Sequence, residues 1–189
     1  MTEFRSNALI AMGGNLPSRA GSPQQTLVAA VAELSKRGLQ VQSVSRFFQT
    51  PCFPAGEGPD YVNAVIQVSG DRSPDDLLSI LHNVEADFAR VRDQRWGMRT
   101  LDLDLIAIGD QVLPDPDTYR QWQGLVLEEQ QNRAPDQLIV PHPRLQDRGF
   151  VLVPLCDIAP DWIHPVLGLS AVEMLAALPK ATLAEVLPL

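Results

Sequence analysis

The fold of this chain is decided by one stretch in its middle, Arg99-Thr100-Leu101-Asp102-Leu103-Asp104-Leu105. Leucine and aspartate alternate here, and side chains that alternate along a β-strand point to opposite faces of the sheet. The pattern therefore predicts a strand over Leu101–Ile108 whose leucines enter the core. Its two aspartates then project side by side from the other face, about 7 Å apart along the strand.

Outward from this strand, helix and strand signals alternate in the order β-α-β-β-α-β. Ser22 and Ser73 each stand directly before a proline, an arrangement favoured at a helix N-terminus, and Gly38 is expected to end the first helix. The order is that of a ferredoxin-like α/β (α+β) fold, in which an antiparallel-rich sheet is flanked by helices. The predicted strands are residues 8–12, 41–47, 61–69 and 101–108, and the predicted helices are residues 22–38 and 73–88.

The rest of the chain shows weaker signals. Residues of about 110–136 are polar and contain prolines, which predicts an extended loop. The apolar run Phe150–Leu155 follows, and a last helix is expected to open at Ser170. With 189 residues the chain has the length of one domain, so residues 1–189 are predicted to form a single domain.

Composition excludes several classes of protein. The net charge is −8, from 15 Lys and Arg against 23 Asp and Glu, whereas proteins that bind nucleic acid usually present a basic surface. No apolar run approaches the length of about 18 residues that a membrane span requires. Cys52 and Cys156 form no CxxC pattern, which favours reduced thiols. We therefore expect a cytoplasmic protein, a monomer or weak dimer, that binds neither nucleic acid nor membrane.

The paired carboxylates Asp102 and Asp104 predict a metal site. Oxygen ligands of this kind favour Mg²⁺ or Mn²⁺ over zinc, and a cation would relieve the repulsion between two close carboxylates. A half-exposed strand with a polar outer face shows the same spacing, however. The pair alone favours that second interpretation, and its neighbours change the balance.

Those neighbours are arginines. Arg90, Arg92, Arg95 and Arg99 fall within ten residues that hold a single acid, Asp93. Arginines beside a magnesium site are what phosphoryl transfer requires, because cations neutralise and position a polyphosphate. No GxxxxGK[ST] loop is present, so arginine and metal would have to hold the phosphates of a nucleotide. A solvated basic loop is the competing interpretation.

Three further groups are candidates for binding. Glu85 lies on the apolar stripe of its predicted helix, where a carboxylate needs a partner, although a boundary residue that reaches solvent fits the same spacing equally well. A single histidine is more often structural than catalytic, but His142 is near Arg144 and Arg148, which makes it a candidate contact for an anion. Tyr61 and Asn63 share one face of a predicted strand, and an aromatic ring with an amide suits a planar heterocycle.

Several short segments occur in order over nearly the whole chain, the most specific being Arg95-Trp96-Gly97-Met98-Arg99-Thr100-Leu101-Asp102-Leu103-Asp104. The others are residues 8–16, 50–51, 59–64, 141–145, 148–152 and 158–160. Together they resemble the 6-hydroxymethyl-7,8-dihydropterin pyrophosphokinase family. The resemblance implies transfer of pyrophosphate from ATP to a pterin alcohol in folate biosynthesis, with release of AMP and a requirement for Mg²⁺.

The resemblance also implies roles for individual residues. Two Mg²⁺ ions would be held by Asp102 and Asp104. The expected catalytic arginines, in or beside a mobile lid, are Arg90, Arg92 and Arg99. The expected pterin-binding residues are Thr50, Pro51, Phe53, Tyr61, Asn63, Trp96 and Phe150. The expected nucleotide-binding residues are His82, Glu85, Arg99, His142 and Arg148.

The chain departs from the family pattern at four positions. Met98 stands where the family usually has proline, and Gly14 replaces the usual serine. Ala89 replaces a glycine, and His82 occupies a position often held by glutamine. None of these changes removes an expected metal ligand or ring-stacking residue.

Three other functions are alternatives to this one. A family member that acts on a different pterin, or that has lost turnover, would keep the same motifs. An RNA-binding module shares the fold class, but the acidic charge argues against it. A glycosyltransferase-like use of the DxD pair usually places it in a loop, whereas this pair lies between alternating leucines.

Overall fold

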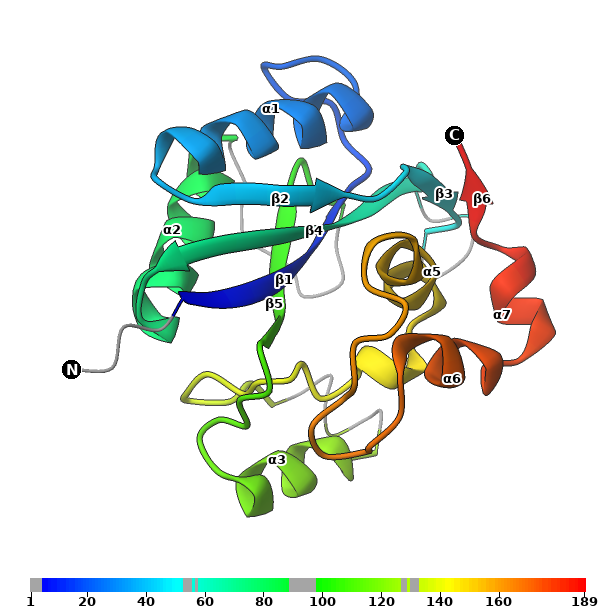
Figure 1. Cartoon of the computed structure of the whole chain (residues 1–189). Helices are drawn as coiled ribbons and strands as arrows, with labels where there is room; N and C mark the ends of the chain where they lie inside the picture. The colour runs from blue at the N-terminus through cyan, green and yellow to red at the C-terminus, as the bar shows by residue number, and fades with distance from the viewer. Residues whose placement is uncertain (1–4, 53–55, 57, 89–97, 127–128, 130–132) are drawn as a thin grey trace.

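The computed structural model describes residues 5–52, 56, 58–88, 98–126, 129 and 133–189, which form a mixed helix and strand domain (Figure 1). The elements in chain order are β1 (Arg5–Gly14), α1 (Pro23–Lys36), β2 (Gln40–Val44), β3 (Phe48–Thr50), β4 (Tyr61–Asp71), α2 (Pro74–Asp87), β5 (Asp102–Ile108), α3 (Pro116–Gln123), η1 (Leu145–Asp147), α5 (Gly149–Ile158), α6 (Ala171–Ala176), α7 (Lys180–Ala184) and β6 (Leu187–Pro188). None of the helices within these ranges is both long and apolar enough to cross a membrane.

The sheet confirms the predicted fold class. In the described part of the chain it has six strands in the order β5-β1-β4-β3-β6, with β2 paired to β4 as well. All of these pairings are antiparallel. Because β4 lies between β1 and the strands that follow α1, the first part of the chain is a split β-α-β unit. This is the ferredoxin-like arrangement, extended at one edge by β6.

The predicted strand at 41–47 ends earlier, as β2 at Val44, and a separate strand, β3, follows only at Phe48. Between them Ser45 is buried, and its hydroxyl accepts a hydrogen bond from the Val65 amide (2.9 Å) and donates one to the Arg46 carbonyl (2.7 Å). Arg46 in turn is held by Asp157 at the end of α5, through bonds from its amide and from its guanidinium. These side-chain bonds interrupt the regular ladder, which the apolar spacing alone does not reveal.

The predicted caps of the first two helices are confirmed. The Ser22 hydroxyl accepts from the Gln25 amide and the Gln25 side chain accepts from the Ser22 amide, which forms a capping box. Ser73 caps α2 in the same position. Gly38 has a φ of +88°, a conformation that glycine adopts without strain, and it follows the end of α1.

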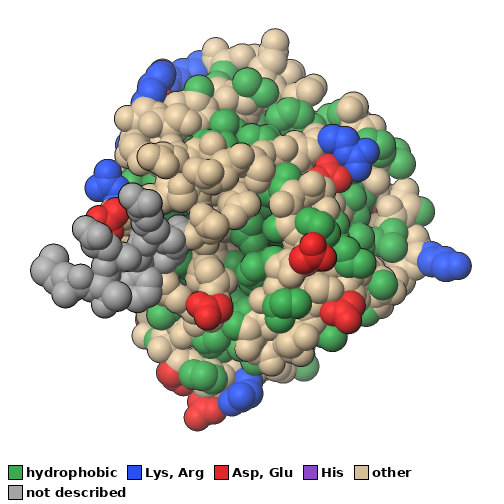
Figure 2. Space-filling model, in the orientation of Figure 1, with side chains coloured by type: hydrophobic (Ala, Val, Ile, Leu, Met, Phe, Trp, Pro, Cys, Tyr) green, Lys and Arg blue, Asp and Glu red, His purple; other side chains and the backbone are tan. Residues whose placement is uncertain are grey.

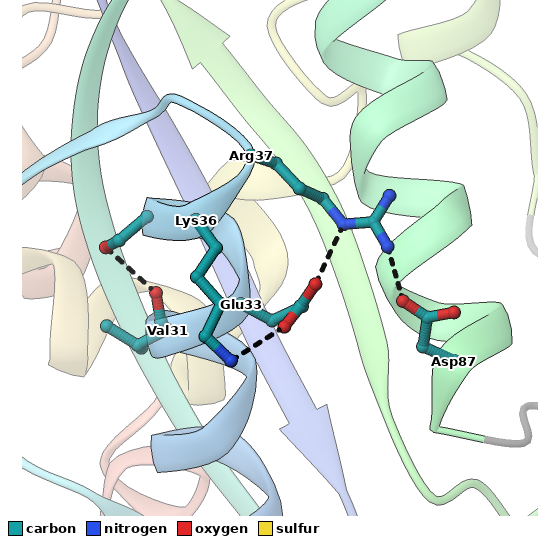
Figure 3. A network of polar contacts seen from close by, with 6 residues as sticks. Val31, Glu33, Lys36, Arg37 and Asp87 are labelled. Carbon is teal, nitrogen blue, oxygen red and sulfur yellow. Dashed lines mark hydrogen bonds and ion pairs between the residues drawn. The ribbon is translucent and has the colours of Figure 1, made fainter.

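The ends of α1 and α2 are also joined across their surfaces (Figure 3). Arg37 pairs with Glu33 in its own helix at 3.3 Å and with Asp87 at the end of α2. Lys36 contacts Glu33 from the other side at 3.3 Å. The network joins the two helices that cover one face of the sheet.

The segment of about 110–136 is not simply an extended loop, because it contains α3. Asp115 caps that helix with hydrogen bonds from the amides of Asp117 and Thr118, both at 2.9 Å. The excursion is closed by paired backbone bonds between Leu113 and Val140, at 2.7 and 3.2 Å. The prediction missed α3 because polar residues and prolines mark helix starts as well as loops.

Tyr119 fastens α3 to the rest of the domain. It is fully buried, and its hydroxyl lies 3.0 Å from Nε2 of the buried His164. The other ring nitrogen, Nδ1 of His164, accepts from the amides of Val166 and Leu167, so the proton of the neutral ring is on Nε2 and is donated to Tyr119. The Trp162 ring packs against His164 edge-on. Burial lowers the pKa of His164 to about 4, which keeps the ring neutral.

The two faces of the sheet pack against different helices (Figure 1). α1 and α2 cover one face, where Ile10, Leu103 and Leu105 are buried. α5 and α6 cover part of the other face, over Leu9, Val65 and Ile106. The apolar run Phe150–Leu155 belongs to α5. In the view of Figure 2, acidic and basic side chains are scattered among apolar ones.

Candidate active site

Strand register brings the predicted binding residues together. Gly13 at the end of β1 pairs with Asn63 of β4 on one side and with Asp102 of β5 on the other, and Ala11 pairs with Asp104. Directly paired residues point to the same face of a sheet. Asn63 and the two aspartates therefore share the face that α5 covers, separated by the strand of Gly13, about 10 Å across two strand spacings.

Gly13 makes room for Asn63. A Cβ atom at Gly13 would lie 3.0 Å from Oδ1 of Asn63, so a larger residue would press against the amide. Asn63 is only 5 % exposed, and its Nδ2 donates to Oγ1 of Thr50 at 2.8 Å. Two residues that were separately predicted to bind the pterin, Thr50 and Asn63, are thus in direct contact.

Each aspartate is paired with an arginine. Nη1 of Arg99 lies 2.6 Å from Oδ2 of Asp102, and Nη1 of Arg148 lies 3.6 Å from Oδ2 of Asp104. The pKa of Arg148 is lowered because burial disfavours its charge, while Asp104 and Asp102 act in the opposite direction. The two carboxylates and the two guanidinium groups form one partly buried cluster of alternating charge.

His142 joins this cluster as a neutral hydrogen-bond donor. Its Nδ1 accepts from the Arg144 amide at 3.1 Å, which leaves the proton on Nε2. Burial, reinforced by the charge of Arg148, lowers the pKa of His142 to about 3. The backbone amide of His142 donates to the Ile106 carbonyl at 2.9 Å, which holds this segment beside β5.

Glu85 reaches the same strand from the opposite side. It lies on α2 and is 1 % exposed, and its Oε1 accepts from the backbone amide of Leu103 at 2.8 Å. Leu103 stands between the two aspartates in the sequence. The buried carboxylate of Glu85 therefore has a hydrogen-bond partner on the strand that carries both aspartates. His82, one turn earlier on α2, is exposed.

The aromatic candidates come from two elements. Tyr61 begins β4 and pairs with Thr50, and Phe150 lies in the first turn of α5 with 40 % of its surface exposed. The guanidinium carbon of Arg148 is 5.6 Å from the centre of the Phe150 ring. Pro51 is exposed at the end of β3. Four other predicted residues, Phe53, Arg90, Arg92 and Trp96, lie outside the described residues, as does the departure at Ala89.

Sequence analysis did not single out Asn15, which joins three segments of this region. It is 2 % exposed; its Oδ1 accepts from the Arg99 amide at 2.8 Å and its Nδ2 donates to the Pro59 carbonyl at 3.0 Å. An asparagine directly after two glycines at the end of a strand was the available signal. Gly14 allows the same close approach, since a Cβ there would lie 2.5 Å from the Thr100 carbonyl oxygen.

The donor set suits magnesium bound together with phosphates. Among the described residues no three His, Cys, Asp or Glu side chains are grouped as a metal site. Asp102 and Asp104 nevertheless present neighbouring carboxylates on one face. Mg²⁺ is commonly bound by one or two carboxylates, with water and substrate phosphates completing its six ligands. The residues present therefore fit that ion when a nucleotide supplies the rest.

Known proteins share both the sequence and the fold. The chain is 35% identical over 169 residues to 2-amino-4-hydroxy-6-hydroxymethyldihydropteridine pyrophosphokinase of Synechocystis sp., covering 89% of this chain and 74% of that protein. It is 34% identical over 159 residues to the protein of the same name from Haemophilus influenzae, covering 84% of each.

Solved structures of HPPK-DHPS show the same fold. The wild-type protein of Plasmodium falciparum matches with a TM-score of 0.61 at 12% identity, over 90% of this chain and 43% of that one. The chain therefore spans less than half of that solved protein. The family model for 7,8-dihydro-6-hydroxymethylpterin-pyrophosphokinase matches residues 9–160. On this match and on its curated relatives, the chain belongs to the 7,8-dihydro-6-hydroxymethylpterin-pyrophosphokinase family.

Proposed function

We propose that this chain transfers pyrophosphate from ATP to the hydroxymethyl group of 6-hydroxymethyl-7,8-dihydropterin in folate biosynthesis, releasing AMP. The observation that carries the proposal is the register of three strands. It sets Asn63, with its partner Thr50, on one side of Gly13 and the pair Asp102 and Asp104 on the other. One face of the sheet therefore offers a site for a heterocycle beside a site for phosphates.

The heterocycle side has groups that suit a pterin ring. An amide such as that of Asn63 both donates and accepts hydrogen bonds, which matches the alternating donors and acceptors at the edge of a pterin. Tyr61 and the exposed ring of Phe150 supply aromatic faces at the ends of β4 and α5. We assign them to the two sides of the ring, with Trp96, Pro51 and Phe53 completing this part of the site.

The phosphate side has cations that are already neutralised by carboxylates. Arg99 and Arg148 pair with the aspartates, and the phosphates of ATP would offer these arginines alternative anionic partners. His142 is in the protonation state to donate from Nε2 to a phosphate oxygen. Bound Mg²⁺, two ions in our proposal, would supply the positive charge that orients the phosphate oxygens.

The reaction joins these two sides. The hydroxymethyl oxygen of the pterin loses its proton to solvent and forms a bond to the β-phosphorus. The bond from that phosphorus to the α-phosphate oxygen breaks, and AMP departs. We assign Arg90, Arg92 and Arg99 to charge stabilisation, and His82 and Glu85 to the nucleotide side. Because no covalent intermediate with the protein is needed, catalysis rests on positioning and charge neutralisation.

Product analysis tests this proposal. The protein is incubated with ATP, Mg²⁺ and 6-hydroxymethyl-7,8-dihydropterin, and nucleotides and pterins are separated. We expect AMP and pyrophosphorylated pterin in equal amounts, and no AMP with 6-methyl-7,8-dihydropterin, which lacks the attacking oxygen. ADP with a monophosphorylated pterin would contradict the assigned bond. Binding of Mg²⁺ and ATP without turnover would point to another acceptor.

We also propose that the protein acts on these small molecules in the cytoplasm as a monomer or weak dimer and binds no nucleic acid. Its net charge of −8 supports the last point, because phosphate backbones are held by basic surfaces. Sedimentation across a concentration series measures the mass. A titration with single-stranded RNA at physiological salt is expected to show no tight binding.

A further inference from the structure

The end of the chain contacts both elements that carry the proposed pterin-binding residues. α7 and β6 span most of residues 180–189, which we call the C-terminal brace. In Figure 1 the brace ends with β6 beside β3, and α7 contacts α5. Thr50 lies on β3 and Phe150 on α5, so this one segment links two parts of the site.

The first contact is a strand pairing. β6 pairs with β3, with Leu187 opposite Gln49 and Pro188 opposite Phe48. The Leu189 amide donates to the Phe47 carbonyl at 2.9 Å. Hydrogen-bonded pairs alternate along an antiparallel ladder, so Leu187 and Gln49 form the next such pair. Pro188, which has no N–H, falls at the position where none is needed.

This pairing acts on the neighbourhood of the pterin site through Gln49. Gln49 directly precedes Thr50, and its side-chain Nε2 donates to Oδ2 of Asp60 at 2.7 Å. Asp60 in turn directly precedes Tyr61. β6 therefore supports Gln49, which directly precedes Thr50 and is hydrogen-bonded to the residue that precedes Tyr61.

The second contact is at the start of α5. Gly149 is buried, and a Cβ atom there would lie 3.0 Å from Cγ2 of Thr182 and 3.6 Å from Cγ2 of Val186. The brace therefore packs against the backbone one residue before Phe150. Val186 itself is 8 % exposed, so this packing is part of the interior.

From these two contacts we infer that the C-terminal brace sets the position of β3 relative to the start of α5, and so the width of the pterin site. Its residues are positioning residues that act through Thr50 and Phe150. The aspartates lie on β5, at the opposite edge of the sheet from β6. Loosening the brace should therefore weaken pterin binding and leave nucleotide binding nearly unchanged. The inference rests on the proposed function.

The test compares Leu187→Pro with Leu187→Ala. The Leu187 side chain is 56 % exposed, so the alanine variant keeps the ladder and loses little packing, whereas proline removes the amide that pairs with Gln49. We expect Leu187→Pro to raise KM for the pterin by about tenfold or more, because small displacements of positioning groups have large effects. The KM of Leu187→Pro for ATP should stay within about twofold of the parent value. For Leu187→Ala, the KM for the pterin and the KM for ATP should both stay within that range.

A second pair of variants tests the contact at α5 if Leu187→Pro does not fold. Gly149→Ala places a methyl group against Cγ2 of Thr182 and should raise KM for the pterin. Because Arg148 directly precedes Gly149, KM for ATP should also rise, but by a smaller factor. Thr182→Ser removes that Cγ2, so the double variant should recover much of the loss. Equal changes in both KM values, or no rescue by Thr182→Ser, would overturn the inference.

Failure of the inference and failure of the proposed function are distinguishable. Parent protein that makes no AMP with the pterin, and binds none of it in calorimetry, overturns the proposed function and the inference with it. Parent protein that turns over normally, with a Leu187→Pro variant that is folded and has an unchanged KM for the pterin, overturns the inference alone. Urea unfolding of each variant shows whether it is folded.

Discussion

The two faces of the sheet differ in polarity, although the same strands form both. Toward α1 and α2, Leu103 and Leu105 are buried, and the helices are joined at their ends by Arg37 and Asp87. Toward α5, the face is apolar over Leu9 and Ile106 but polar where Asp102 and Asp104 lie. One face thus supplies packing along its length, which leaves part of the other free to hold charged groups.

Replacing the aspartates should show the difference between the two faces most clearly, because it should affect turnover far more than stability. Asp102→Asn and Asp104→Asn keep the side-chain size and remove a charge on the polar face. We expect turnover to fall by about 10³-fold, equivalent to about 4 kcal/mol in the barrier, because each carboxylate would help hold Mg²⁺. AMP formation under saturating substrates gives the rate.

The same variants are then unfolded in urea. Their free energy of unfolding should change by less than about 1 kcal/mol for Asp102, since exposed or half-exposed pairs contribute little. Asp104→Asn should cost no more than that, because its contact with the partly buried Arg148 is longer, at 3.6 Å, and the Asp104 side chain is 43 % exposed. Turnover at the parent rate in both variants would remove the metal assignment.

Leu103→Ala should mainly lower stability, whereas the aspartate variants mainly lower turnover. Its side chain is 3 % exposed and lies on the apolar face, between the two aspartates. Truncation should lower the free energy of unfolding by about 3–4 kcal/mol through lost burial and a residual cavity. Val28→Ala on α1, where the side chain is 54 % exposed, is the matched control and should change it by less than about 0.5 kcal/mol. Equal effects of the two variants would show that this face is not the stabilising one.

Burial of His164 should make the free energy of unfolding depend on pH. Burial lowers its pKa from 6.5 to about 4, so between these values the unfolded chain binds a proton that the folded protein does not. Stability is therefore lost as pH falls from about 6.5 to 4, by at most about 3 kcal/mol from this residue. His164→Gln should flatten that part of the pH profile of unfolding. A profile as steep as that of the parent would show that other groups are responsible.

The smallest effect is expected at the outer surface of the apolar face. Arg37→Ala breaks the contacts with Glu33 and Asp87 shown in Figure 3. Arg37 and its two partners are all partly exposed. The free energy of unfolding should therefore fall by about 0.5 kcal/mol, and by less in high salt. A double-mutant cycle with Asp87→Ala measures the coupling. A coupling energy above about 2 kcal/mol would mean that the network organises the ends of α1 and α2.

Much of the fold could be predicted because the relevant signals are local. The alternation at residues 101–105 is a property of any strand, and the burial of Leu101, Leu103 and Leu105 confirms the predicted orientation. Ser22 and Ser73 cap helices through bonds within three residues. The paired aspartates and the arginine next to them were also recognisable, since their spacing alone places them on one side of a strand.

Other features depend on partners distant in the sequence. The break between β2 and β3 rests on Val65 and Asp157, and the docking of α3 rests on Tyr119 meeting His164. Asn15 joins the segments of Arg99 and Pro59, which lie 84 and 44 residues away in the chain. None of these contacts has a periodic pattern, so spacing alone could not predict the partners.

By itself the sequence determined which side chains share a face of each strand and where the first two helices begin, because strand alternation and N-capping act over two or three residues. The tertiary structure decided that Asn63, Gly13 and Asp102 lie at one level of the sheet, and that Glu85 reaches the amide of Leu103. It also decided that the end of the chain packs beside Gly149. Those relations follow from inter-strand register and from packing between distant segments, which local spacing does not encode.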